Sequence, residues 1–460
     1  MNIKIRDIIK ICKGKLLWGN EETVCENFSK DTRTIQQNDV YVGIKGENFD
    51  GNMLFEDAFK KGAKVCILQG VTPSEDIKNK YKETSCILVE NTIKALQEMA
   101  SYKRDLYNIP VIAITGSVGK TSTKDIVASV VGTEFNVLKT QGNLNNHIGL
   151  PLTILGLKEH NALVVEMGMN NLGEISLLSK IAKPNIAIIT NVGTSHIGNL
   201  GSRENILKAK LEILDGLKQD GVLIVNNDND LLHDWASNEK NINLYTYGIH
   251  NLSNTMAENI VLKEDSSEFM VNINEKEKII VPVGGEHFVY NALCAVMVGK
   301  ILKISAKNIK YGIQKFELTK SRMELINLKN NVLLINDCYN ANYDSMKAGI
   351  EYLSKASANR KIAVLGDMLE LGEFSYELHK KVGKEILENK IDILVTVGEM
   401  GKVISDTVIQ KNKNVFHCNT NKQAVEVILK IIQQDDIIFV KASNGMKFKE
   451  IVEGICKLYE

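Results

Sequence analysis

A glycine-rich segment that ends in a Lys-Thr pair can bind phosphate, and here the segment TGSVGKTS occupies residues 115–122. It follows an apolar run and leads into a helical pattern over 120–131. Its glycines let backbone N–H groups turn towards phosphate oxygens, and the start of the helix adds the positive end of its dipole. Lys120 is placed to bridge β- and γ-phosphates, and the hydroxyl of Thr121 to ligate Mg²⁺. We predict a shortened phosphate-binding loop, with Ile114 where the usual motif has its first glycine; a turn that binds nothing is the alternative.

Two residues of metal-ligand type follow the next predicted strands. Glu166 stands in the apolar run 162–167, and His196 follows the run 185–190. In a parallel sheet the carboxyl ends of these strands meet at the edge that carries the phosphate-binding loop. Glu166 is a natural oxygen ligand for Mg²⁺, whereas imidazole prefers softer metals. His196 is therefore either an unusual ligand or a loop residue that makes a hydrogen bond.

Two lysines, Lys208 and Lys210, lie on the predicted helix 203–217 that follows His196. An ammonium group beside Mg²⁺ would be repelled. The lysines therefore bind phosphates or carboxylates, or one of them reacts with CO₂ to form a carbamate, which turns a cation into a carboxylate-like ligand. A solvated helix face that carries two lysines is the alternative that the sequence alone favours.

A repeated pattern of buried strand, turn and helix must position these groups. In the middle of the chain, apolar runs typical of buried parallel strands stand at 111–115, 162–167, 185–190 and 221–225. Between 243 and 283 the pattern changes to alternating strands, which predicts an antiparallel edge, and a long helix follows at 287–302. The middle unit is therefore predicted to be a doubly wound, mostly parallel sheet with helices on both faces.

The same alternation predicts two further α/β units. Later apolar runs, which predict a separate Rossmann-like sheet, stand at 331–337, 361–366, 393–397, 415–418 and 436–441. A smaller N-terminal α/β unit is predicted from strands at 40–44, 65–68 and 86–89 and helices at 52–61 and 92–106. We expect three domains, residues 1–106, 107–316 and 317–460, whose limits rest on the change of pattern alone.

The composition excludes several classes of protein. The 460 residues carry 56 basic and 56 acidic side chains, so the broad positive charge of a non-specific nucleic-acid binder is missing. No apolar run approaches the roughly 18 residues that a membrane span needs. The eight cysteines show no Cys-x-x-Cys spacing, so we expect reduced, mostly buried thiols. We expect a cytoplasmic monomer that binds neither nucleic acid nor membrane.

The order of the motifs over essentially the whole chain resembles the Mur ligases, ATP-dependent amino-acid and peptide ligases of peptidoglycan precursor synthesis. The matching segments are the loop 115–122, the run 142–151, the strand of Glu166, the run 196–202, the pair 209–210, and the later segments 285–287, 321–324 and 337–342. The segment YNAN at 339–342 resembles the members that add D-alanyl-D-alanine, whereas the Asp-Asn-Pro-Arg signature of the members that add a diamino acid is absent.

The resemblance implies roles for the matching residues. The residues implied in ATP binding are Gly116, Ser117, Gly119, Lys120, Thr121, Ser122, His287, Asn291, Arg322 and Asp337. The implied ligands of Mg²⁺ are Thr121, Glu166, His196 and a carbamate on Lys210. The groups implied in catalysis are Lys120, Lys210, His196 and Arg322. Arg322 and Asp337 would reach the phosphates and ribose when the C-terminal domain closes over the site.

The N-terminal segments at 29–33, 39–47 and 50–51 resemble the UDP-binding domain of the family. Hydroxyl, carboxylate and lysine groups on loops suit uracil, ribose and pyrophosphate, although Asp-Thr-Arg read alone is a surface turn in most proteins. The residues implied in binding the UDP-muramoyl-peptide and the dipeptide are Ser29, Asp31, Arg33, Lys45, Gly46, Asp50, Asn143, Asn145, Asn146, Asn340 and Asn342.

The implied reaction is the ATP-dependent joining of D-alanyl-D-alanine to a UDP-N-acetylmuramoyl-tripeptide through an acyl phosphate. Three positions depart from the family pattern, with Asn52 in place of His, Tyr343 in place of Pro and Asn444 in place of Arg. The alternatives are a diamino-acid-adding Mur ligase, a folylpolyglutamate synthetase and a nucleotide-binding switch that ligates nothing. The UDP-binding segments argue against the synthetase, and the set of metal ligands argues against the switch.

Overall fold

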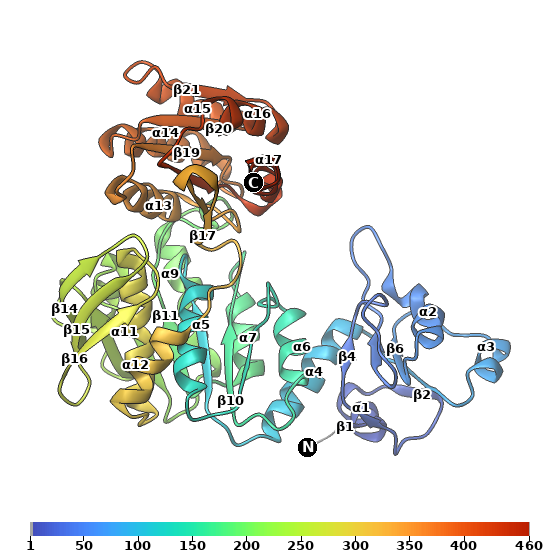
Figure 1. Ribbon diagram of the computed structural model, residues 1–460. Helices are drawn as coiled ribbons and strands as arrows, with labels where there is room; N and C mark the ends of the chain where they lie inside the picture. The colour runs from blue at the N-terminus through green and yellow to red at the C-terminus, as the bar shows by residue number, and fades with distance from the viewer. Residues whose placement is uncertain (1–2, 460) are drawn as a thin grey trace.

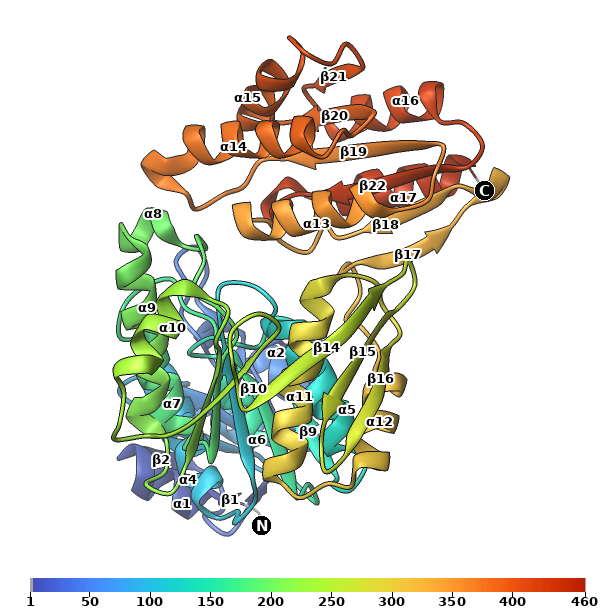
Figure 2. The same ribbon diagram turned by 90° about the vertical axis from the view of Figure 1, so that its left-hand side faces the viewer.

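The computed structural model describes residues 3–459, which form three α/β units built on separate sheets (Figure 1). The N-terminal unit lies beside the central unit, which it meets where helix α4 (Thr92–Asp105) packs on α6 (Gly149–Leu155). The C-terminal unit lies over the end of the central unit where strand β8 (Val111–Thr115) meets helix α5 (Lys120–Val131) (Figure 2). The predicted α/β class is confirmed, whereas the domain limits at 106 and 316 stay predictions.

The central sheet has nine strands in the order β16-β15-β14-β13-β12-β11-β8-β10-β9. Their bounds are β9 (Val137–Lys139), β10 (Ala162–Glu166), β11 (Ile186–Ile189), β12 (Val222–Asn226), β13 (Asn243–Gly248), β14 (Thr255–Leu262), β15 (Ser267–Asn272) and β16 (Lys276–Val281). Neighbours from β9 to β14 run parallel, and β14 to β16 form an antiparallel edge, as predicted. Every residue of β8, β10, β11 and β12 is buried, which explains why these strands are continuous apolar runs.

Helices complete the central unit. Besides α5 and α6 they are α7 (Glu174–Ala182), α8 (Ile197–Leu200), α9 (Arg203–Leu211), α10 (Asp230–Asn238), α11 (Glu286–Ile301) and α12 (Ala306–Lys315). The parallel register places Glu166 beside Ile114 and Ile189 beside Thr115. The loops that follow β8, β10 and β11 therefore leave the sheet at the same edge.

The helix predicted at 203–217 is shorter than expected. The α-helix ends at Leu211, and a 3₁₀ turn follows over Glu212–Gly216. The Glu212 carboxylate accepts hydrogen bonds from the N–H groups of Gly173 (2.7 Å) and Ser176 (3.2 Å) at the start of α7. The backbone of Gly216 lies so close to α7 that a Cβ there would stand 2.1 Å from the carbonyl oxygen of Ser179. Packing against α7 thus accounts for the tighter turn.

The other two sheets are smaller. The C-terminal sheet, in the order β17-β18-β22-β19-β20-β21, contains β17 (Glu324–Asn327), β18 (Leu333–Asn336), β19 (Arg360–Gly366), β20 (Ile393–Val397), β21 (Val415–Cys418) and β22 (Asp436–Lys441). Its helices are α13 (Tyr343–Lys355), α14 (Ser375–Glu388), α15 (Glu399–Val408), α16 (Asn421–Ile431) and α17 (Lys449–Tyr459). Only β17 runs antiparallel to its neighbour.

The N-terminal sheet has the order β2-β7-β6-β5-β4. Its strands are β2 (Lys15–Trp18), β4 (Phe28–Ser29), β5 (Val40–Val42), β6 (Val65–Leu68) and β7 (Ser85–Leu88), and a separate pair joins β1 (Ile3–Lys4) to β3 (Val24–Cys25). The helices α1 (Ile5–Cys12), α2 (Phe55–Lys60) and α3 (Glu75–Lys80) accompany α4. Six of the eight cysteine side chains are buried and two are partly buried, in line with the prediction. Across residues 3–459 no helix combines the length and apolar character needed to cross a bilayer.

Candidate active site

The loop between β8 and α5 is held in place by Asn191, which follows β11. Asn191 Oδ1 accepts hydrogen bonds from the N–H groups of Ser117 (3.0 Å) and Val118 (2.9 Å). Gly119 then begins α5 with a φ of 81°, a left-handed conformation that favours glycine. The next N–H groups belong to the first helical turn, where they have no partner within the helix. The second half of the loop is therefore free to bind an anion, while Asn191 holds the first half.

Beside this loop a hydroxyl and a carboxylate meet as predicted. Thr121 Oγ1 donates a hydrogen bond to Glu166 Oε2 over 2.9 Å, and Asn145 Nδ2 donates to Glu166 Oε1 over 2.8 Å. Lys120 Nζ donates to the carbonyl oxygen of Gly116 over 2.8 Å. Burial lowers the pKa of Lys120, and the nearby Glu166 carboxylate opposes that shift. The site thus combines a hard-oxygen pair with an ammonium group, as a metal-bound polyphosphate requires.

Lys210 and Lys208 differ sharply in environment. The Lys210 side chain on α9 is buried, with 1% of its surface exposed, whereas Lys208 is exposed. Burial and the neighbouring Lys120 ammonium hold the pKa of Lys210 well below its ordinary value. The solvated-face interpretation is therefore right for Lys208 and wrong for Lys210.

His196 lies at the boundary with the C-terminal unit. Its Nδ1 is 2.9 Å from Oε2 of Glu370, and the imidazole beside it lowers the pKa of Glu370. The φ of His196 is 62°, in a region that non-glycine residues seldom adopt. No hydrogen bond or ion pair in the described part of the chain joins His196 to Glu166 or Lys210. Its role as a metal ligand stays a prediction, and Glu370 is a partner that the sequence did not reveal.

A cavity of about 170 Å³ separates the loop from the C-terminal unit. Arg322 enters it from the C-terminal side: its guanidinium carbon lies 4.1 Å from the centre of the Tyr339 ring, and its Nη2 donates to Thr121 Oγ1 over 3.4 Å. Arg322 Nε is buried and lacks a hydrogen-bond partner among the described residues. The predicted arginine therefore reaches the residues that were predicted to handle phosphate.

The far wall of the same cavity comes from α11. His287 lines the cavity, and burial lowers its pKa to about 4, against the opposing influence of the Asp337 carboxylate. Asn291 Oδ1 accepts a hydrogen bond from the hydroxyl of Thr123 over 3.0 Å, so its oxygen is already engaged by α5. Both predicted nucleotide residues thus reach the cavity, together with Asn226, Tyr247 and Tyr290, which the sequence did not reveal.

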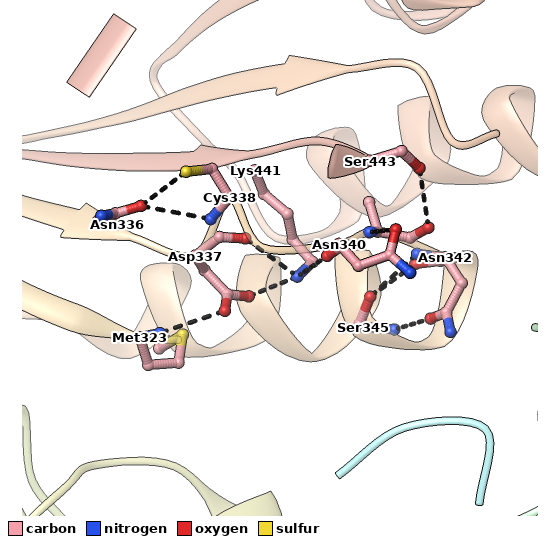
Figure 3. Close-up of polar contacts among 10 residues, drawn as sticks. Met323, Asn336, Asp337, Cys338, Asn340, Asn342, Ser345, Lys441 and Ser443 are labelled. Atoms are coloured by element: carbon pink, nitrogen blue, oxygen red, sulfur yellow. Dashed lines mark hydrogen bonds and ion pairs between the residues drawn. The ribbon is translucent and has the colours of Figure 1, made fainter. Parts of the chain in front are cut away.

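The C-terminal wall is held by an ion pair between Asp337 and Lys441 (Figure 3). Lys441 Nζ lies 2.5 Å from Asp337 Oδ2 and also donates to the carbonyl oxygen of Asn340 over 3.0 Å. Asp337 Oδ1 accepts the N–H of Met323 over 3.2 Å. Asp337 was predicted, but Lys441 was not, because a lysine at the end of an apolar strand has no distinctive spacing.

Asn342 links the C-terminal unit to the phosphate-binding loop. Its Oδ1 accepts the N–H of Ser345 over 2.8 Å and so caps α13. Its Nδ2 donates to Ser195 Oγ, which in turn donates to the carbonyl oxygen of Ser117 over 3.0 Å. A continuous chain of hydrogen bonds therefore runs from the start of α13 to the loop. The Asn342 side chain makes these structural contacts and also lines the cavity.

Two of the three predicted asparagines near β9 have structural contacts of their own. Asn146 Oδ1 accepts the N–H groups of Ile148 (3.1 Å) and Gly149 (2.8 Å) before α6. The carbonyl oxygen of Asn143 accepts the N–H of Asn145 over 2.8 Å, while the Asn143 side chain is exposed. Of the three, Asn145 is the one that touches the Glu166 carboxylate.

The predicted UDP-binding residues form local turns. Asp31 accepts hydrogen bonds from the Arg33 side chain, which lowers the pKa of Asp31 to about 2, and Ser29 Oγ accepts the Asp31 N–H over 3.1 Å. A bridge pairs Lys45 with Asp50, and the Gly46 N–H donates to a carbonyl within the same turn. These contacts fit the surface-turn interpretation of Asp-Thr-Arg, so the UDP role stays a prediction.

Comparison with known proteins decides the family. The family model described as "Mur ligase middle domain" matches residues 114–299, and the model described as "Mur ligase, glutamate ligase domain" matches residues 321–444. The UDP-N-acetylmuramoyl-tripeptide–D-alanyl-D-alanine ligase of Bacillus subtilis is 38% identical over 456 residues, which cover 98% of each chain. The chain belongs to the Mur ligase family.

Solved structures of Mur ligases share the whole architecture of this one. MurF from Acinetobacter baumannii superposes with a TM-score of 0.89 at 28% identity and covers 99% of both chains. MurF from Thermotoga maritima in complex with ADP gives a TM-score of 0.82 at 26% identity, with 94% of this chain and 97% of that chain covered. The predicted family and the three-domain fold are confirmed.

The departures from the Mur ligase pattern are accommodated by local contacts. Asn52 is fully buried and joins Asp50, through its Nδ2 (2.7 Å), to the Gln69 N–H, through its Oδ1 (3.0 Å). The Tyr343 hydroxyl donates to Glu385 Oε1 over 2.8 Å and so connects α13 with α14. Asn444 begins a 3₁₀ turn over Asn444–Met446 and does not line the cavity.

Proposed function

We propose that this Mur ligase joins D-alanyl-D-alanine to a UDP-N-acetylmuramoyl-tripeptide and converts ATP to ADP and phosphate. The observation that carries the proposal is the meeting of Lys120, Thr121 and Glu166 with Arg322 across one cavity. The activity for which the Bacillus subtilis relative is named, a protein similar over 98% of this chain, supplies the substrates.

The residues at this site fit Mg²⁺. Thr121 and Glu166 offer a hydroxyl and a carboxylate oxygen 2.9 Å apart, which are the hard donors that Mg²⁺ takes in phosphate sites. We propose that these two residues hold one Mg²⁺ ion and that His196 lies near a second Mg²⁺ ion. A bound Mg²⁺ neutralises negative charge on the phosphate oxygens.

A carbamate on Lys210 fits the environment of that side chain. The side chain is buried, and the neighbouring Lys120 ammonium disfavours a second positive charge there. The lowered pKa of Lys210 favours the neutral amine, which is the form that reacts with CO₂. The resulting carboxylate would attract Lys120, and it would supply an anionic ligand beside the metal site. The carbamate therefore turns an unfavourable charge pair into a favourable one.

In the proposed reaction the carboxylate of the tripeptide attacks the γ-phosphorus of ATP. The bond between the γ-phosphorus and the bridging oxygen breaks, so ADP leaves and an acyl phosphate forms. The amine of D-alanyl-D-alanine then attacks the acyl carbon, loses a proton and expels phosphate. Lys120 and Arg322, which both line the cavity, stabilise charge on the transferring phosphoryl group.

The position of the C-terminal unit supports the exclusion of water from the cavity during these reaction steps. Residues of α13 and Arg322 cover the cavity, and Asn342 ties α13 to the loop through Ser195. An acyl phosphate exposed to water would be hydrolysed, so a covered site protects the intermediate. We propose that Asn340 and Asn342 face the dipeptide, and that residues 29–50 bind the UDP moiety. We further propose that the enzyme acts as a monomer in the cytoplasm.

The test is phosphate release from ATP by the purified chain. The assay contains Mg²⁺, a UDP-muramoyl-tripeptide and, in separate arms, D-alanyl-D-alanine, D-alanine, L-lysine or meso-diaminopimelate. Release that depends on both the tripeptide and D-alanyl-D-alanine is expected. Release that depends on a diamino acid instead, or on no added amine, contradicts the assigned substrates.

A further inference from the structure

Lys441, at the end of β22, is a buried residue of the cavity wall and has no part in the reaction as described above. Only 1% of its side chain is exposed. Its three hydrogen bonds go to Asp337 Oδ2 (2.5 Å), the Asp337 carbonyl oxygen (3.4 Å) and the Asn340 carbonyl oxygen (3.0 Å) (Figure 3). An ammonium group has three donors, so all of them serve the segment that follows β18.

Through Asp337 this ammonium supports the backbone around Arg322. Ser321 and Met323, on either side of Arg322, have φ values of 60° and 47°, a left-handed conformation that is unfavourable for residues with a side chain. The Met323 N–H donates to Asp337 Oδ1, and the Ser321 N–H donates to Glu324 Oε2 over 3.1 Å. These two contacts hold the strained turn from which Arg322 reaches the loop.

Through Asn340 the same ammonium fixes the surface on which Arg322 rests. The Tyr339 ring lies 4.1 Å from the Arg322 guanidinium carbon, and Tyr339 is the residue before Asn340. The carbonyl that Lys441 holds therefore belongs to the same turn as the stacked ring. One lysine thus contacts both structures that orient the arginine: the carboxylate beneath its backbone and the segment that carries its aromatic neighbour.

We propose that Lys441 is a positioning residue that holds Arg322 in the orientation needed to meet the terminal phosphate of ATP. This inference rests on the proposed role of Arg322 in the ligase. Without Lys441, the carboxylate of Asp337 would lose its counter-charge and its fixed place, and the turn at 321–323 would relax. Arg322 would then lose contact with the outermost phosphate, while His287 and Asn291 on the α11 side of the cavity would keep their places.

The proposal is tested by measuring affinities for ADP and for the β,γ-methylene analogue of ATP, each with Mg²⁺, by calorimetry. Arg322→Ala is expected to weaken binding of the triphosphate analogue relative to ADP by about tenfold, the loss of one charge-assisted contact. Lys441→Met should reproduce most of that change, and the double variant should add nothing further, because both substitutions remove the same contact. Lys441→Arg, which keeps the charge, should retain more of the selectivity than Lys441→Met.

Arg360→Met is the matched control. Arg360 pairs with Asp436, the first residue of the same strand β22, through contacts of 2.9 and 2.6 Å, and neither residue lines the cavity. Arg360→Met should lower the midpoint temperature of thermal unfolding, as we also expect for Lys441→Met. It should leave the preference for the triphosphate analogue over ADP unchanged. Should Lys441→Met fail to fold, Lys441→Gln keeps one donor for Asp337 and is expected to lose selectivity by several-fold.

Wild-type selectivity in the Lys441 variants, beside a loss in Arg322→Ala, would overturn the inference. Additive losses in the double variant would overturn it as well. Wild-type selectivity in Arg322→Ala would overturn both the inference and the proposed role of Arg322. These binding measurements need neither the tripeptide nor the dipeptide, so they are independent of whether phosphate release depends on D-alanyl-D-alanine.

Discussion

The anchoring of the phosphate-binding loop by Asn191 leads to a quantitative prediction. Asn191→Ala removes the side-chain acceptor of two N–H groups, those of Ser117 (3.0 Å) and Val118 (2.9 Å), while the Ser117 N–H keeps the backbone carbonyl oxygen of residue 191 at 3.1 Å. Each such hydrogen bond contributes about 1 kcal/mol net, so the free energy of unfolding should fall by about 1 kcal/mol for the Val118 contact and by at most about 2 kcal/mol in total. The loop must be ordered again when nucleotide binds. The same 2 kcal/mol therefore sets an upper bound of about 30-fold on the loss of ATP affinity.

Asn185→Ala provides the matched control at the other end of the same strand. Asn185 Oδ1 accepts the N–H of Val111 over 3.0 Å, on the edge of the sheet away from the loop. Urea unfolding should show a loss of about 1 kcal/mol for this variant. Calorimetry with Mg²⁺ and the β,γ-methylene ATP analogue should show unchanged affinity for Asn185→Ala and a roughly fivefold to thirtyfold loss for Asn191→Ala. Equal nucleotide affinity in the two variants would refute the reasoning that Asn191 prepares the loop for phosphate.

Three further outcomes are expected. Lys210→Ala should lose ligase activity that short-chain carboxylates partly restore; undiminished activity in the variant would remove the carbamate from the mechanism. Glu166→Gln should raise the Mg²⁺ concentration needed for half-maximal phosphate release, because a neutral amide is a weaker ligand, and an unchanged requirement would count against the assigned ligand. His287 has a pKa of about 4 in the folded protein, against about 6.5 when unfolded. The folded state therefore binds fewer protons between these values, and stability should fall as pH drops from 6.5 to 4. In urea unfolding at pH 7 and pH 5, His287→Asn should lose less stability than the wild type, and an equal loss in both would contradict this origin.

The elements that the sequence predicted well are those whose burial dictates their residues. Strand β8 and helix α5 were predicted with the bounds that the structure has, since a strand covered on both faces must be apolar throughout and the loop between them carries its own motif. The helix after His196 was predicted too long. Its last turn is set by packing against α7, a contact between segments more than thirty residues apart in the sequence.

The candidate site likewise contains residues whose contacts the sequence predicted and residues that it missed. Glu166 and Thr121 were predicted to meet, because parallel strands deliver their carboxyl ends to one edge. Lys441, Asn191 and Glu370 were missed, since each acts on a residue distant in sequence and none has a spacing that marks it. The burial of Lys210 was also beyond the sequence, because two lysines on a helix are usually solvated. Three-dimensional contacts, and not residue type, assigned these four positions.

The central claim, ligation through an acyl phosphate, is tested most directly by following oxygen. The tripeptide substrate is labelled with ¹⁸O in its terminal carboxylate and incubated with the enzyme, ATP, Mg²⁺ and D-alanyl-D-alanine, and the released phosphate is analysed by mass spectrometry. Because the attacking carboxylate oxygen stays on phosphorus when the amine expels phosphate, each phosphate should carry one ¹⁸O, in equal amount to the amide product. Unlabelled phosphate, or phosphate released without amide product, would contradict the account.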